Sequence, residues 1–318
     1  MAKKKKTPAG NRQAKQRTFA SQLLRVAAGA IFLMAVAAGI ILVALILLPK
    51  NNTPVRPLHP IADKTPRRPV FEIYPEEAPS RPVARKPCKS VQTGVKPSVA
   101  IIIDDVGYDR RIARRFLDIG IPVTLSVLPH SPFSKSIAQT AHEKNMEIML
   151  HLPMEPLEYP KVNPGPGVLL TAMSPDELIR QLEAAIADVP HVKGVNNHMG
   201  SKMTAISTQM YQIFTVLKKH DLFFIDSRTS SGTLCKPSAR LLRVPFSERD
   251  VFLDNSLSSD YIDHQLDILV DIACQKGSAI GIGHPHSATL RVIKQNLGWM
   301  QQKVTFVPAS HLVEQIGL

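Results

Sequence analysis

Short apolar runs alternate with longer amphipathic stretches along the chain from about Ser98 onwards. The apolar runs are three to six residues long and rich in Val, Ile, Leu and Phe, as buried strands are. The predicted strands are Ser98–Ile103, Val123–Leu128, Glu147–Leu150, Val192–Asn196, Leu222–Ile225, Val251–Leu253, Ala279–Gly283 and Val304–Phe306. The predicted helices between and after them are Asp109–Asp118, Ser134–Lys144, Pro175–Asp188, Thr208–His220, Asp260–Lys276, Ala288–Asn296 and Ser310–Ile316.

This alternation predicts parallel βα units, because a helix returns the chain to the starting edge of the sheet. The helix at Pro175 has clear start signals, with Ser174 as its N-cap and Glu177 placed to complete a capping box. Roughly 220 residues with seven or eight such units favour a (β/α)-type barrel. A doubly wound open sheet is the alternative that the pattern leaves open.

A much longer apolar run, residues 26–48, precedes this region. Its length is that of a transmembrane helix, which needs about 20 residues. A cleaved signal peptide is the alternative, but its apolar core is typically about 7–15 residues long and ends at small residues. The basic residues of segment 1–25 predict a cytoplasmic N-terminus, so the rest of the chain is expected in the periplasm, beyond the inner membrane.

Residues 49–97 contain eleven of the 26 prolines and little apolar periodicity. Such a composition cannot bury a core and favours an extended linker. We therefore expect four parts: a basic cytoplasmic tail (1–25), a transmembrane helix (26–48), a Pro-rich linker (49–97) and a folded domain (98–318). Cys88 lies in the linker, and a disulfide between Cys235 and Cys274 is left open by the sequence.

The formal net charge of +13 belongs to the N-terminal parts of the chain. Residues 1–25 carry eight Lys and Arg and no acid, and residues 49–97 carry ten Lys and Arg against four acids. Residues 98–318 carry 21 basic and 22 acidic residues. The folded domain therefore lacks the basic excess that nucleic-acid binding requires, and no nucleic-acid partner is expected.

Polar residues capable of chemistry follow nearly every predicted strand. In chain order they are Asp104-Asp105, Pro129-His130, His151 with Glu155, Asn197-His198, Asp226-Ser227-Arg228, Asp254-Asn255 and His284-Pro285-His286. Each of them alone also fits an ordinary role as a helix cap, a loop residue or a core histidine. Their joint placement favours function, because the carboxyl ends of parallel strands form the face where active sites lie.

Asp, Glu and His supply the oxygen and nitrogen ligands of a catalytic zinc site. Such a metal ion lowers the pKa of a water molecule and polarises a carbonyl group. The sequence contains no Gly-x-Ser-x-Gly, no His-Glu-x-x-His and no phosphate-binding glycine loop. A divalent metal, with zinc as the first choice, is therefore the expected cofactor.

Several of these stretches resemble the divergent polysaccharide deacetylase family, a distant branch of the carbohydrate deacetylases. The matching stretches are Ile102-Ile103-Asp104-Asp105-Val106-Gly107, Glu147-Ile148-Met149-Leu150-His151-Leu152-Pro153-Met154-Glu155-Pro156, Gly194-Val195-Asn196-Asn197-His198-Met199-Gly200-Ser201, Phe224-Ile225-Asp226-Ser227 and Gly281-Ile282-Gly283-His284. The resemblance covers residues from about 98 to 318. It implies an irregular (β/α)7-type barrel with a metal-dependent hydrolase site.

The resemblance also implies roles for individual residues. Asp104 matches the catalytic base, Asp105 and His151 match metal ligands, and His284 matches the general acid. Where the wider family has the second His of a His-x-x-x-His motif, this chain has Glu155. His198 stands where an Arg-x-Pro-x-Gly motif is expected, so it is a candidate replacement ligand beside Glu155.

Two functions follow from these residues. The first is hydrolysis of N-acetyl or O-acetyl groups of an envelope polysaccharide, with peptidoglycan as a candidate. Under this hypothesis, the sugar site is lined by Asn197, Asp226, Arg228 and His286. The second is a catalytically degenerate module that binds a glycan or an envelope partner, because the ligand set and the Arg motif have changed. A scaffold role in the envelope is a third reading that the sequence leaves open.

Overall fold

The computed structural model describes residues 95–315. The predicted tail (1–25) and transmembrane helix (26–48), with nearly all of the linker (49–97), lie outside the described residues. Within residues 95–315, no helix is long and apolar enough to cross a membrane. The described residues therefore make up the predicted C-terminal domain without its last three residues.

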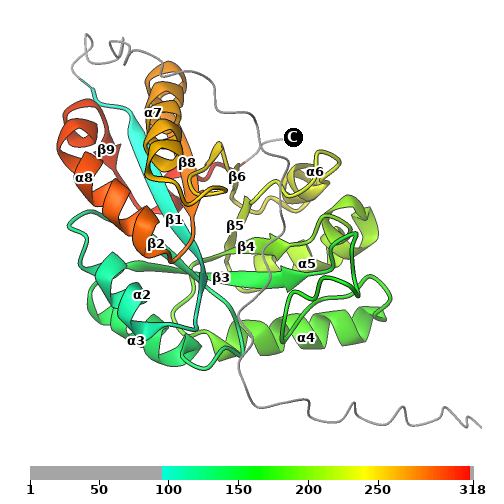
Figure 1. Ribbon diagram of the computed structural model, residues 1–318. Coiled ribbons are helices and arrows are strands. Elements are labelled where there is room, and N and C mark those ends of the chain that lie inside the picture. Colours follow the sequence, from blue (N-terminus) through cyan, green and yellow to red (C-terminus); the bar gives the residue numbers. More distant parts are fainter. Residues whose placement is uncertain (1–94, 316–318) are drawn as a thin grey trace, which may run out of the picture. The chain divides into compact units, whose positions relative to one another are not determined.

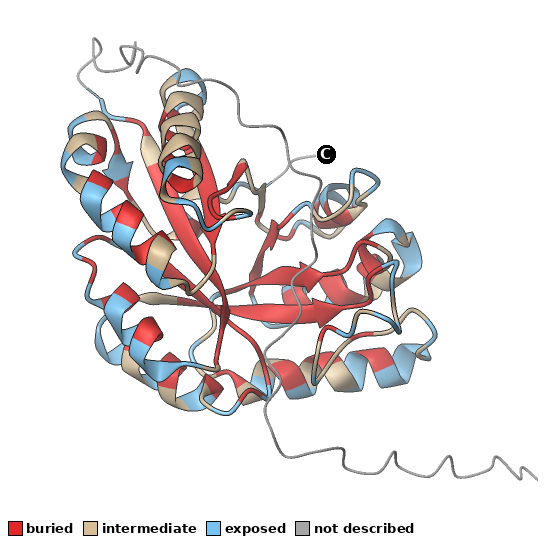
Figure 2. Ribbon diagram, viewed as in Figure 1, coloured by how far each residue is buried: buried red, intermediate tan, exposed pale blue. Residues whose placement is uncertain are grey.

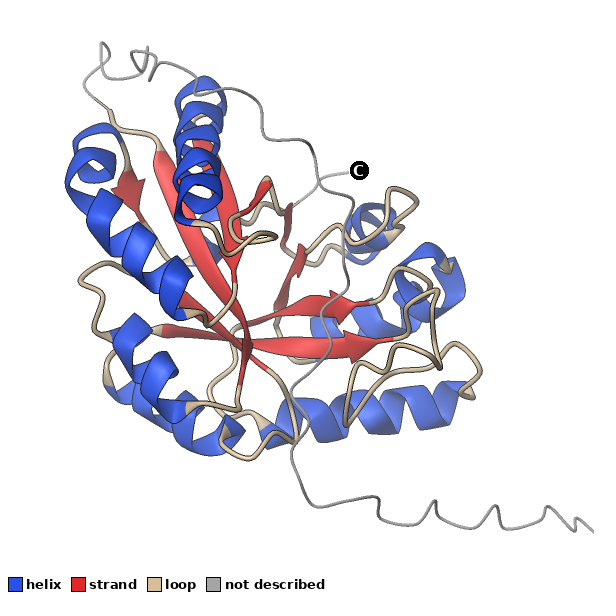
Figure 3. Ribbon diagram, in the orientation of Figure 1, coloured by secondary structure: helices blue, strands red, loops and turns tan. Residues whose placement is uncertain are grey.

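The domain alternates strands with helices, as the hydrophobic pattern predicts (Figure 3). The strands are β1 (Ser98–Val106), β2 (Thr124–Val127), β3 (Glu147–Met154), β4 (Gly194–Met199), β5 (Phe223–Asp226), β6 (Phe246–Glu248), β7 (Val251–Phe252), β8 (Ser278–Gly283) and β9 (Thr305–Phe306). The α-helices are α2 (Arg110–Leu117), α3 (Ser134–Glu143), α4 (Pro175–Asp188), α5 (Ser207–Lys219), α6 (Cys235–Leu242), α7 (Ser259–Lys276) and α8 (Ser287–Lys303). Two short 3-10 helices are η2 (Met203–Ala205) and η3 (Ala309–Leu312).

The strands form one sheet in the order β6-β5-β4-β3-β2-β1-β8-β7, and β9 also pairs with β1. Every pairing between these strands is parallel. The sheet curves into a half-barrel with β6 and β7 at its edges (Figure 1). The predicted parallel α/β fold is thus confirmed, and in place of the predicted (β/α)7-type barrel the sheet forms a half-barrel.

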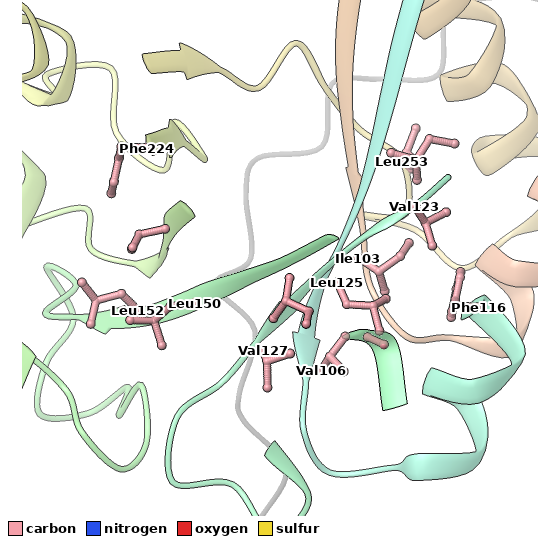
Figure 4. Packing of buried hydrophobic residues seen from close by; sticks show 14 of the residues in the cluster. Ile103, Val106, Phe116, Val123, Leu125, Val127, Leu150, Leu152, Phe224 and Leu253 are labelled. Carbon is pink, nitrogen blue, oxygen red and sulfur yellow. The ribbon is translucent and has the colours of Figure 1, made fainter. Parts of the chain in front are cut away.

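Two buried clusters lie on the two faces of this sheet. The larger cluster joins residues such as Ile101 and Ile103 of β1 to the helices, and Figure 4 shows part of it around Phe116 and Leu125. The smaller cluster contains Ile102 and equivalent residues of other strands, together with Ala309 of η3, but no residue of an α-helix. The strands are almost entirely buried (Figure 2). Because the α-helices of residues 95–315 pack against one face of the sheet and not the other, the doubly wound alternative does not apply to this domain.

Strand β1 is irregular at the point where the two aspartates lie. Its register against β2 shifts between Ile103 and Val106, and Asp105 has a left-handed backbone with φ 53°. Three steps on β1 therefore match two on β2, which is the geometry of a β-bulge. Adjacent strand residues normally point to opposite faces, so the bulge allows Asp104 and Asp105 to share one face.

The helix starts follow local chemistry where the sequence signals are strong. The capping box of α4 is formed, with Ser174 and Glu177 bonded reciprocally. Helix α6 and strand β6 have no counterpart among the predicted elements. Helix α6 is hard to predict from the sequence because it contains Pro237. Proline is nevertheless tolerated in the first turn of a helix, where the backbone amide needs no intrahelical partner.

The predicted helix Ser310–Ile316 is wrong over the residues described there. The 3-10 helix η3 ends at Leu312, and Glu314 then pairs with Phe246 as an antiparallel bridge. Two backbone hydrogen bonds of 3.0 and 3.1 Å hold this bridge, so pairing with the edge strand replaces the helix. Cys235 is a free buried thiol and Cys274 is disulfide-bonded, which excludes a Cys235–Cys274 pair.

The glycine after the bulge provides a test of how tightly this region is packed. Gly107 has φ 148°, and a Cβ there would collide with the Ser131 side chain. Gly120 has φ 95° but open space around it. We expect Gly107→Ala to lower the free energy of unfolding by about 1–3 kcal/mol more than Gly120→Ala, because only the first adds overpacking to backbone strain. Urea denaturation measures both, and equal losses would contradict the packing argument.

Candidate metal centre

Three side chains from three strands converge at the carboxyl end of the sheet. They are Asp105 of β1, His151 of β3 and His198 of β4, and all three residues are buried. Asp105 Oδ1 lies 3.1 Å from His151 Nε2 and 2.9 Å from His198 Nδ1. The two imidazole nitrogens are 3.1 Å apart. The three atoms thus form a nearly equilateral triangle.

This triangle fits the coordination of one divalent metal ion. Metal–ligand bonds of about 2.1 Å place two ligand atoms about 3.0 Å apart at an octahedral angle of about 90° and about 3.4 Å apart at a tetrahedral angle of about 109°. Both carboxylate oxygens of Asp105 are buried and accept no well-aligned hydrogen bond in the described part of the chain, although two imidazole nitrogens lie within 3.1 Å of Oδ1. Nε2 of His198 likewise has no hydrogen-bond partner there. An unsatisfied buried carboxylate is costly, and a cation would satisfy it.

The hydrogen bonds of His151 leave its Nε2 available as a ligand. Its Nδ1 lies 2.9 Å from Oδ1 of Asn196. The amide of Asn196 points its nitrogen at the Asp104 carboxylate, at 2.8 and 3.1 Å, so its oxygen must face His151. An amide oxygen accepts only, and Nδ1 therefore carries the proton. In the neutral ring Nε2 then has the free lone pair that a metal requires.

Charge is stabilised unequally at the two aspartates. Burial alone would raise the pKa of Asp105, but the His198 and His151 rings outweigh it and hold that pKa well below its ordinary value. Burial raises the pKa of Asp104, against the opposing effects of His151, His284 and Asn196. Asp105 is thus suited to hold a cation, whereas Asp104 is suited to accept a proton.

A second pair of groups lies after β7 and β8. His284 Nδ1 is 2.8 Å from Asp254 Oδ1, and the His284 amide donates to the other Asp254 oxygen at 2.7 Å. Thr289 of α8 also donates to Asp254, at 2.5 Å. Burial lowers the pKa of His284, but Asp254 overcomes this and raises it to about 9. His284 is therefore protonated at neutral pH and can donate a proton.

Comparison with known proteins agrees with this geometry. A sequence model of divergent polysaccharide deacetylases matches residues 101–313, well over half of the chain. The chain belongs to the divergent polysaccharide deacetylase family. The resemblance predicted from its motifs is thereby confirmed.

Curated relatives in the family come from two bacteria. The uncharacterized protein YibQ of Escherichia coli (strain K12) is 37% identical over 217 residues, which cover 68% of this chain and 67% of YibQ. An uncharacterized protein of Haemophilus influenzae is 31% identical over 214 residues, 67% of this chain and 76% of its own. A crystal structure of an uncharacterized protein from Agrobacterium tumefaciens C58 has a TM-score of 0.65 at 27% identity, covering 69% of this chain and 89% of its own.

Glu155, the residue at the second His position of the family motif, lies outside the cluster of three. Its carboxylate binds Lys202 Nζ at 2.6 Å and the Thr171 amide at 2.5 Å. Strand β3 runs on to Met154, and residues four apart in a strand are separated by about 13 Å. His151 and Glu155 therefore cannot meet at one ion here, and His198 takes the third position of the triangle.

Two of the residues expected to line a sugar site have local partners instead. Asn197 donates to Met199 O and Thr229 Oγ1 and accepts from the Ser227 amide. Asp226 accepts from the Arg228 amide and Thr233 Oγ1. Both side chains point away from the small cluster because they alternate with Asn196 and Ile225 along their strands. These bonds give Asn197 and Asp226 a structural role, and their contact with a sugar stays a prediction.

Arg228 and His286 lie closer to solvent. The Arg228 side chain is 41% exposed and forms an ion pair with Glu248 at 3.1 Å. His286 is the N-cap residue of α8, with its ring 6.2 Å from that of His284. Their contact with substrate stays a prediction.

Two residues of the site were assigned no role from the sequence: Asn196 was not among the candidates, and Asp254 was a candidate without an assigned task. Asn196 lies two residues before His198, and Asp254 lies two residues after Phe252 of the small cluster. A two-residue step keeps a side chain on the same face of a strand. Both residues could therefore have been found from the sequence by counting in steps of two along each strand from a residue on the inner face of the sheet.

The geometry separates the two candidates for the third ligand. We expect His198→Ala to weaken zinc binding by more than about 100-fold, because it removes a ligand, and Glu155→Gln to weaken it by less than about tenfold. Competition with a chromophoric chelator measures both affinities. A larger loss of zinc affinity in Glu155→Gln than in His198→Ala would indicate that Glu155, and not His198, is the third ligand.

Proposed function

We propose that the protein is a metal-dependent hydrolase that removes acetyl groups from an envelope polysaccharide, with peptidoglycan as the first candidate. The observation that carries the proposal is the pairing of a buried carboxylate with a proton-donating imidazole beside the triangle of ligand atoms. Asp104 Oδ2 lies 3.7 Å from His151 Nε2, and the charge of His284 interacts with both Asp104 and Asp105. A module that only binds glycan has no need of such a pair.

Asp105, His151 and His198 would hold the metal ion, for which zinc is the expected identity. One carboxylate and two imidazoles are a ligand set that zinc hydrolases use, with a position left open. A bound divalent ion supplies Lewis acidity toward the acyl carbonyl and lowers the pKa of water.

The remaining residues move the protons of the reaction. Asp104 takes a proton from the attacking water as the water oxygen bonds to the acyl carbon. His284 gives a proton to the leaving nitrogen or oxygen of the sugar as the bond from that atom to the acyl carbon breaks. The products are acetate and the free amine or hydroxyl group. Asp254 keeps His284 charged and oriented for this transfer.

The place of action is part of the same proposal. Residues 26–48 anchor the chain in the inner membrane, with 1–25 in the cytoplasm and the domain in the periplasm. This rests on the apolar run and the basic residues before it. The orientation can be tested with reporter proteins fused to the C-terminus. We expect activity from a reporter that works only outside the cytoplasm. Activity of a reporter that works only in the cytoplasm would contradict the orientation.

Replacement of the proposed base provides the direct test of catalysis. Asp104→Asn should reduce acetate release from acetylated envelope glycans by at least about 100-fold, because the amide cannot accept the proton of water. Bound zinc should be retained, since Asp104 is not one of the three ligands. Undiminished release would remove Asp104 as the base, and a wild-type protein that binds glycan without releasing acetate would favour the binding module.

The raised pKa of His284 predicts a pH dependence. A general acid must be protonated, so kcat/KM should fall as pH rises through about 9. Asp254→Asn removes the largest cause that raises the pKa, and this fall should then begin at lower pH. Thr289→Val is the control, because it loses a bond to Asp254 but keeps the charge. Equal profiles for the three proteins would contradict the pairing.

A further inference from the structure

One fully buried amide connects the two halves of the proposed site. Asn196 is the third residue of β4 and has no exposed surface. Its Oδ1 lies 2.9 Å from His151 Nδ1 and accepts from Ser126 Oγ at 2.5 Å. Its Nδ2 donates to Asp104 at 2.8 and 3.1 Å and to Ser227 Oγ at 3.3 Å. All donor and acceptor capacity of this side chain is thus directed at groups of the site and two serines.

These contacts allow one orientation of the amide. Turning it over would set its oxygen against the Asp104 carboxylate and its NH2 group against His151 Nδ1. The first contact would be acceptor against acceptor, which costs the hydrogen bond and adds repulsion. The same orientation that presents N–H to Asp104 therefore also presents an acceptor to His151.

We infer that Asn196 is a positioning residue that couples the base to the metal ligand. Through Oδ1 it fixes His151 in the tautomer with Nε2 free for metal, and through Nδ2 it aims the Asp104 carboxylate. Groups that accept a hydrogen bond from the other ring nitrogen of a metal-bound histidine commonly fix its tautomer and orientation. The inference rests on the proposed function, which assigns the metal to His151 and the base to Asp104.

The chain offers a matched control in the next residue. Asn197 is also a buried asparagine of β4, and its amide makes hydrogen bonds of similar length. Its partners are Met199, Thr229 and Ser227, and among the described residues it has no hydrogen bond to Asp104 or His151. Loss of the Asn197 hydrogen bonds should therefore destabilise the protein about as much as loss of the Asn196 bonds, without affecting Asp104 or His151.

Two substitutions at Asn196 separate its contact with Asp104 from its contact with His151. Asn196→Asp keeps an acceptor toward His151 but loses the N–H toward Asp104, and two adjacent carboxylates then compete for a proton. It should keep zinc affinity within about tenfold and lose acetate release. Asn196→Ala removes both contacts and should weaken zinc binding by about 10–100-fold as well. Asn197→Ala should keep zinc affinity within about tenfold, because its amide contacts neither His151 nor Asp104.

The experiment measures zinc affinity and acetate release on the full-length chain for wild type and these three variants, with thermal unfolding recorded for each. A second readout is the Nδ1 proton of His151 in zinc-loaded protein labelled with 15N-histidine. This signal should persist in Asn196→Asp and Asn197→Ala and exchange rapidly in Asn196→Ala. A positioning role is overturned if Asn196→Ala matches Asn197→Ala in affinity and in this signal. If wild type itself binds no zinc or releases no acetate, the proposed function fails and the inference falls with it.

Discussion

The site depends on one irregularity in one strand. Regular alternation would send Asp104 to the inner face of β1 and Asp105 to the face covered by helices, where Ile103 and Val106 lie. The bulge and the left-handed backbone of Asp105 bring both carboxylates to the same face. A base and a metal ligand can then be adjacent in sequence and still serve one centre. Strain of this kind is tolerated where the surrounding structure holds it, and β1 is paired over its length with β2, β8 and β9.

Electrostatics distinguishes the groups that this arrangement brings together. Both aspartates are buried, but Asp105 lies against two imidazoles that keep it ionised, whereas at Asp104 burial outweighs the opposing effects and raises the pKa. His284 is kept charged by Asp254 despite its own burial. Groups of the same type thus acquire different tasks from their surroundings. The Asn196 amide lies between Asp104 and His151, where it links the charge of one to the tautomer of the other.

Much of the fold could be predicted because strands and helices have different hydrophobic periods. All eight predicted strands overlap strands of the structure, but β6 was missed because only one of its three residues, Phe246, is apolar. The face that carries Asp104, Asp105, His151 and His284 could also be predicted, because parallel strands share one carboxyl edge. The choice between Glu155 and His198 could not, since it depends on β3 continuing as a strand through Met154. The direction of the Asn197 and Asp226 side chains could not be predicted either, because position after a strand does not say which way a side chain points.

The proposed mechanism requires that Asp105, His151 and His198 hold one divalent ion. The most direct test is an anomalous difference map from crystals grown with zinc and measured at the zinc absorption edge. We expect one strong peak within about 2.0–2.3 Å of Asp105 Oδ1, His151 Nε2 and His198 Nδ1. A crystal with no peak at this triangle, or with the peak bound by Glu155 instead, would contradict the account.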